Sequence, residues 1–124
     1  MLRFLLVCLF GAAGSGTRYL VGTWAGQRLG SAFPWGTLFV NLAGCFLIVL
    51  IMELALRTTF SPNLRLALTT GFMGGLTTYS TFNYETLRLV QEGATATALA
   101  NLAATLFGCF AAGLAGLAVA RAVS

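Results

Sequence analysis

The residues best suited to chemistry lie in one segment, 69–85, where two adjacent glycines precede a run of hydroxyl side chains. Gly75 is the midpoint of the charge-free stretch 66–84. Adjacent glycines weaken a helix, and the Thr and Ser residues that follow can cap the backbone groups that a break sets free. The pattern predicts a helix that is broken near its centre, and a flexible but continuous helix is the alternative.

A broken helix would present two kinds of backbone group. The end of its first half would offer carbonyl oxygens to a cation, and the start of its second half would offer N–H groups to an anion. Asn41 and Arg18 extend the anion chemistry, because an Asn amide can donate two N–H bonds and a guanidinium stays charged. Arg18 would attract anions at the mouth of a path or, alternatively, only extend its charge toward water.

Two glutamates are each followed by an arginine at a spacing that makes the two residues neighbours on a helix. Glu53 and Arg57 are four residues apart with the acid first, which is the favourable order for an ion pair on a helix. Glu85 and Arg88 could pair in the same way at a spacing of three. Glu85 also closes the segment 69–85, so a functional interpretation stays open for it.

Two stripes recur at every fourth residue. The weakly polar stripe comprises Thr97, Asn101, Thr105, Cys109 and Gly113. It could line a path or only form hydrogen bonds between helices. Small residues recur at the same spacing, and they are Gly14, Gly22, Gly26, Gly108, Ala112 and Gly116. Such residues let helix backbones approach closely in lipid, and we expect at least some of them at a subunit interface.

Composition defines the elements that must position these residues. Of the 124 residues, 58% are apolar and 8% are charged, whereas soluble domains carry about 25% charged residues. A chain this short has too little interior to hide so much apolar surface from water. Charge-free runs cover 29–52, 66–84 and 93–120, and a membrane helix needs about 20 apolar residues. We therefore predict an all-α membrane protein, one transmembrane domain over 1–124, with helices at about 4–26, 35–56, 65–91 and 94–120.

The connections are short, and the charges give only a weak orientation signal. Four spans place both termini on one side together with Arg3, Arg57, Arg65 and Arg121, against Arg28 and Arg88 on the other side. Positive residues favour the cytoplasm, but four against two is a small bias. Insertion in both orientations followed by antiparallel pairing is therefore possible. Residues 1–15 could alternatively be a cleaved signal peptide, which the shortness of their apolar run disfavours.

Several classes of function are excluded by residue type. The chain has no His and no Asp, and its three cysteines form no C-x-x-C pair. Zinc or iron–sulfur ligation and nucleophile–histidine catalysis therefore have no plausible residue set, and we predict no enzyme activity. The seven Arg are spread along the chain and form no basic stripe, so nucleic-acid binding is disfavoured.

At this point the sequence resembles a known family, the small bacterial fluoride channels called Fluc or CrcB. The resemblance runs over nearly the whole chain. It is carried by Gly-Thr-Arg-Tyr at 16–19, Gly-Thr-Leu-Phe-Val-Asn-Leu at 36–42 and Gly-Gly-Leu-Thr-Thr-Tyr-Ser-Thr-Phe at 74–82, with Glu85 following. The last motif is the most specific of the three.

The resemblance implies a dual-topology antiparallel homodimer in the bacterial inner membrane, with two pores that export fluoride passively. It also implies a structural Na⁺ at the dimer centre, held by the backbone carbonyls of Gly74 and Thr77. Fluoride would meet Asn41 and the aromatic pair Tyr79 and Phe82. The further residues of the implied fluoride path are Ser80, Thr81, Glu85 and Thr105, and Arg18 would be the vestibule arginine.

The chain departs from the family pattern at two places. The first aromatic residue of the pair is commonly Phe and is Tyr79 here, and the hydroxyl track of the fourth span is reduced to Thr105 and Cys109, with Gly113 after them. The alternatives are a proton-coupled small multidrug transporter and a non-transporting membrane scaffold subunit. The first rival needs an acid in the first span, and this chain has none there.

Overall fold

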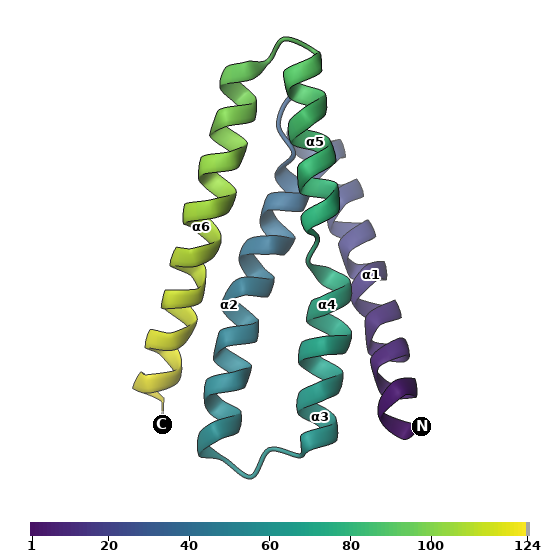
Figure 1. Cartoon of the computed structure of the whole chain (residues 1–124), viewed down its shortest axis with the longest axis vertical. Helices are drawn as coiled ribbons and strands as arrows, with labels where there is room; N and C mark the ends of the chain where they lie inside the picture. The colour runs from purple at the N-terminus through teal and green to yellow at the C-terminus, as the bar shows by residue number, and fades with distance from the viewer. Residues whose placement is uncertain (124) are drawn as a thin grey trace.

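The computed structural model describes residues 1–123 and is helical throughout, with no strand among those residues. Its helices form four columns (Figure 1). The first, second and fourth columns are the single helices α1 (Leu2–Leu29), α2 (Trp35–Arg57) and α6 (Thr95–Ala122). The third column is a stack of four elements, which are α3 (Pro62–Leu66), the π-helical segment η1 (Ala67–Met73), α4 (Gly74–Leu76) and α5 (Tyr79–Gln91). The predicted all-α class is confirmed, and each column differs from its predicted range by only a few residues.

Three of the columns are single helices that can cross a membrane. α1, α2 and α6 contain 28, 23 and 28 residues and are apolar enough to span. The third column covers a similar length in shorter pieces. The start of α1 and the end of α6 lie at the same end of the bundle (Figure 1), as four antiparallel columns require. The protein is therefore a multi-pass membrane protein.

The connections between columns are short and depend on a few local signals. Gly30 and Gly93 adopt φ of 82° and 83°, which glycine reaches without steric cost. Ser61 caps α3 by accepting a hydrogen bond from the Leu64 N–H, and Pro62 occupies the first turn. These short links keep neighbouring columns antiparallel and adjacent.

Small residues let the columns pack closely. A Cβ at Gly14 would collide with the Phe72 carbonyl, and a Cβ at Gly75 would collide with the Gly11 carbonyl, so α1 and the η1–α4 segment lie in backbone contact. Gly116 faces the Phe46 carbonyl in the same way, which brings α6 onto α2. Gly14 and Gly116 of the predicted small-residue stripes thus pack within one chain, whereas Gly26 borders open space.

The apolar core of the single chain is small. Its centre is formed by Val40, Met73 and Leu76, with Val21 and Phe72 among the residues packed against it. Many large apolar side chains lie on the outside, and on α6 they are Leu99, Leu102, Leu106, Phe107, Phe110, Leu114 and Val119. Such a surface is stable only against lipid or against another protein surface.

Candidate functional site

The candidate site is centred on the junction between α4 and α5. Thr77 (φ −84°, ψ 155°) and Thr78 (φ −152°, ψ 124°) have extended backbone, and α5 begins at Tyr79. We call this pair the extended link; it is the thin connection below α5 in Figure 1. Gly74 and Gly75, where the sequence placed the weak point, have helical backbone within α4. The non-helical residues therefore follow the glycine pair by two positions.

Asn41 of α2 holds the extended link in place. Its Nδ2 donates to the Thr78 carbonyl at 3.0 Å, and its Oδ1 accepts from the Thr78 N–H at 2.8 Å. The side chain is buried, so it replaces two helical hydrogen bonds that the link lacks. The sequence interpretation gave Asn41 two N–H bonds for an anion; one of them is used on Thr78, and one remains.

The carbonyl groups at the end of α4 are released by the same clamp. An uninterrupted helix would direct the Thr78 N–H at the Gly74 carbonyl, but this N–H is bonded to Asn41. Gly74 and Thr77 both line an open cavity of about 640 Å³ between α2 and the η1–α4 segment. Gly44 on α2 makes room there, because a Cβ at this position would collide with the Thr77 methyl group.

Thr78 also caps α5. Its hydroxyl oxygen accepts from the Thr81 N–H at 3.2 Å and lies 3.1 Å from the Thr81 hydroxyl. The exposed Ser80 hydroxyl lies 3.4 Å from the same atom. The capping role that the sequence suggested for the hydroxyl residues is confirmed for Thr78, and three hydroxyl groups lie at the positive end of the α5 dipole.

The predicted aromatic pair lies on one face of α5. The ring centroids of Tyr79 and Phe82 are 5.6 Å apart and the planes meet at 69°, an edge-to-face arrangement. Phe82 is 7% exposed and Tyr79 is 81% exposed, so one ring is fixed by packing while the other projects from the chain. Both rings line a cavity of about 750 Å³ together with Asn41 and Thr105. The structure thus brings four of the predicted fluoride-path residues to one cavity.

Arg18 faces protein on the opposite side of the extended link. Its Nε donates to the Gly75 carbonyl at 3.0 Å, and the side chain is half-buried. It borders a cavity of about 310 Å³ that Thr78 and Thr81 also line. The guanidinium therefore satisfies a carbonyl near the end of α4 and places a positive charge beside the start of α5.

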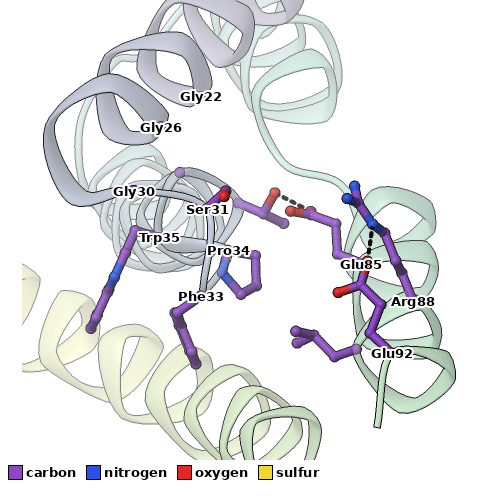
Figure 2. A pocket seen from close by; sticks show the side chains of 13 residues that line it. Gly22, Gly26, Gly30, Ser31, Phe33, Pro34, Trp35, Glu85, Arg88 and Glu92 are labelled. Atoms are coloured by element: carbon purple, nitrogen blue, oxygen red, sulfur yellow. Dashed lines mark hydrogen bonds and ion pairs between the residues drawn. The ribbon is translucent and has the colours of Figure 1, made fainter. Parts of the chain in front are cut away.

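Glu85 lies in a separate pocket at the end of the bundle where α1 joins α2. The Thr37 hydroxyl donates to Glu85 Oε1 at 2.5 Å, and Figure 2 shows Glu85 beside the ion pair of Arg88 with Glu92. The pocket measures about 230 Å³, and Gly22 and Gly26 line its α1 side. Glu85 is therefore apart from the cavity of the aromatic rings.

The ion pairs differ in part from those predicted. The Glu53–Arg57 pair is confirmed, with 3.7 Å between Oε2 and Nη2. The possible Glu85–Arg88 pair is wrong, because Arg88 Nε bonds Glu92 Oε1 at 2.8 Å and Glu85 bonds Thr37. Arg88 thus pairs with Glu92, four residues after it, and not with Glu85, three residues before it, since the Thr37 hydroxyl is bonded to the Glu85 carboxylate.

The polar stripe of the fourth span forms hydrogen bonds to α5, which is one of the two alternatives that the sequence left open, and only the partner Thr86 was not identified. The fully buried Asn101 of α6 donates from Nδ2 to the Thr86 hydroxyl at 2.8 Å, and that hydroxyl donates to the Phe82 carbonyl at 2.7 Å. Thr105 extends the chain by donating to Asn101 Oδ1 at 3.4 Å. The polar stripe of the fourth span thus fixes α6 to α5 at the Phe82 carbonyl. The Asn in an apolar helix was the available signal.

The fold and these sites define a class, the multi-pass α-helical membrane proteins that hold polar groups around a non-helical link within the bundle. The comparison with known proteins then gives the family. The profile of the CrcB-like protein family, Camphor Resistance (CrcB), matches residues 5–117. The chain belongs to the CrcB family, as the sequence motifs indicated.

Relatives resemble the chain over nearly its full length. It is 53% identical to a protein of Anaeromyxobacter dehalogenans named fluoride-specific ion channel FluC, over 122 residues that cover 98% of this chain and 97% of the relative. Proteins of the same name from Sorangium cellulosum and Geobacter metallireducens are 52% and 50% identical, each over 98% of this chain and over 96% and 98% of the relative.

Proposed function

We propose that the protein is a fluoride-selective ion channel of the bacterial inner membrane that lets F⁻ leave the cytoplasm passively. The observation that carries this proposal is the joint presence of the Tyr79–Phe82 ring pair and Asn41 on one cavity. The names of the full-length relatives support the same ion. The process is permeation and includes no catalytic step.

The chemistry of the cavity suits a small, strongly hydrated anion. Aromatic rings carry a positive edge, and rings presented edge-on can partly replace water around an anion. The free N–H of Asn41 and the N-terminus of α5 add donors along the same route. In the proposed path, Ser80 and Thr105 contribute hydroxyl groups beside the rings.

The opposite side of the link supplies the approach to the path. Arg18 holds a positive charge next to Thr81, which raises the local concentration of anions. Glu85 lies further along, where the hydroxyl of Thr37 binds its carboxylate. In this proposal a passing anion competes for that hydroxyl, because a hydroxyl can donate to only one acceptor at a time.

We propose an antiparallel, dual-topology homodimer with two pores. The cavity of the rings is open on one side, and Tyr79 is 81% exposed beside the apolar face of α6. A second copy would close this cavity and cover that face. The weak charge asymmetry between the two ends of the bundle supports insertion in both orientations.

The proposed dimer would hold a central Na⁺. The carbonyls of Gly74 and Thr77 fit this role, because the clamp on Thr78 releases the first from the helical pattern and both residues line an open cavity. Hard cations prefer oxygen ligands, and a two-fold axis would supply each carbonyl twice. Na⁺ would fix the two link regions against each other when bound.

A flux assay in liposomes tests the proposal. Vesicles loaded with potassium fluoride and containing the purified protein should release F⁻ when valinomycin opens a path for K⁺, with no proton gradient applied. Vesicles loaded with chloride should release little, and vesicles without protein provide the baseline. Proton-coupled cation export would instead support a small multidrug transporter, and no transport of either kind would support a scaffold subunit; both would overturn the proposal.

The topology is tested with single introduced cysteines. Ser31 follows α1 and Thr59 follows α2, so the two positions lie at opposite ends of the bundle (Figure 1). In a chain whose native cysteines are replaced by Ala, an impermeant maleimide should label Ser31→Cys partly from each side of the cell membrane, and Thr59→Cys likewise. Labelling of each site from one side only would refute dual topology.

A further inference from the structure

Two of the three cysteines form a pair between α2 and α6. Cys45 of α2 and Cys109 of α6 have neighbouring side chains that line the same two cavities, and both residues are half-buried. Together they line the cavity of the aromatic rings and a second cavity of about 430 Å³. Cys8 lies exposed on α1 and lines neither cavity. The pair is thus a distinct thiol site beside the rings.

The chemistry of such a pair is specific. Two sulfur atoms that face each other across a helix contact can bind one soft metal ion from both sides, and soft ions select thiol ligands over oxygen. The chain has no His and no Asp. Within residues 1–123 no group of three or more His, Cys, Asp or Glu is placed to form a larger metal site. A two-coordinate ion is therefore the ligand that matches the site.

We propose that Cys45 and Cys109 form a binding site for a soft, two-coordinate metal ion in the wall of the ion path, and that occupation of this site blocks the path. With mercuric chloride as the probe, each sulfur forms a bond to mercury and releases its proton. The two mercury–chlorine bonds break, and two chloride ions leave. The product is one S–Hg–S bridge between α2 and α6, with no change of oxidation state.

The bridge would act on conduction through its position. Asn41 lies one helical turn from Cys45 on α2, and Thr105 lies one turn from Cys109 on α6, so the metal would lie next to the polar groups of the cavity. A large ion at this point would narrow the space in front of Phe82. The effect on flux rests on the proposed channel function, whereas the metal site does not.

Binding is tested first by mass and thiol counting on the purified protein in detergent. One equivalent of mercuric chloride should add one mercury and remove two protons, and maleimide labelling after denaturation should fall from three thiols to one. Cys8→Ala should bind mercury in the same way, leaving no thiol for maleimide. Cys45→Ala and Cys109→Ala should bind mercury only through a single sulfur, and an added monothiol should remove that mercury. Equal retention of mercury by these variants and by the original chain would overturn the site.

Fluoride efflux tests the position of the site. Mercuric chloride should lower the efflux of the original chain and of Cys8→Ala at least tenfold, while Cys45→Ala and Cys109→Ala should keep most of theirs. A bridged protein that conducts at the full rate would overturn the placement on the path. Absence of fluoride flux before any mercury is added would contradict the proposed function and leave the mass measurement to decide the metal site.

Discussion

Replacement of Asn41 by Leu isolates the clamp on the extended link. Leu keeps a similar volume but cannot bond the Thr78 peptide groups, which Asn41 holds at 2.8 and 3.0 Å. Two lost hydrogen bonds cost about 1 kcal/mol each, and leaving the half-buried Thr78 groups without partners adds roughly 1 kcal/mol more. The expected loss is about 3 kcal/mol in the free energy of unfolding, and fluoride efflux should fall with it because α5 loses its fixed start.

The measurement is chemical or thermal unfolding of the purified protein in detergent, followed by circular dichroism. A loss of about 3 kcal/mol corresponds to a fall of roughly 10 °C in the melting temperature for a chain of this size. Asn83→Leu is the matched control, because Asn83 is exposed on α5 and the same chemical change there should alter stability by less than about 0.5 kcal/mol. If Asn41→Leu is as stable as this control, the clamp does not hold the link.

Three further predictions concern the groups around the link. Phe82→Ile keeps apolar bulk but removes the ring edge, so it should nearly abolish fluoride efflux without changing the oligomeric state on gel filtration. Tyr79→Phe keeps the ring and should conduct. Normal efflux through Phe82→Ile would mean that the rings only pack. Arg18→Ala removes the charge and its bond to a backbone carbonyl, so both efflux and melting temperature should fall, and an unchanged melting temperature would contradict the structural part of this role. Asn101→Leu should lower the free energy of unfolding by about 1 kcal/mol, since an apolar side chain replaces one buried hydrogen bond between α5 and α6. A loss as large as that of Asn41→Leu would contradict this small contribution of the network.

Local patterns in the sequence determined the helical columns and the contacts within them. Long charge-free runs must cross the membrane as helices, because backbone groups in lipid need partners within their own segment. Residues three or four apart on a helix are neighbours whatever surrounds them. This is why the Tyr79–Phe82 contact and the Glu53–Arg57 pair follow from spacing alone.

The tertiary structure decided which polar groups meet across the bundle. Arg18 reaches a carbonyl 57 residues away, Thr37 reaches Glu85 over 48 residues, and Asn41 reaches Thr78 over 37. Such contacts depend on the rotation and axial shift of whole helices against each other. These quantities are set by close packing at small residues together with the hydrogen bonds between helices.

The position of the non-helical residues was likewise determined partly by the sequence and partly by the tertiary structure. The sequence indicated weakness at Gly74 and Gly75 because glycine has low helix propensity. Both glycines nevertheless have helical backbone, and Gly75 packs against α1, because the absence of a Cβ there allows contact with the Gly11 carbonyl. The helix ends instead where Asn41 supplies an alternative partner for the backbone of Thr78. The sequence alone thus determined that this column is weak near its centre, and the neighbouring helices decided at which residue the helix ends.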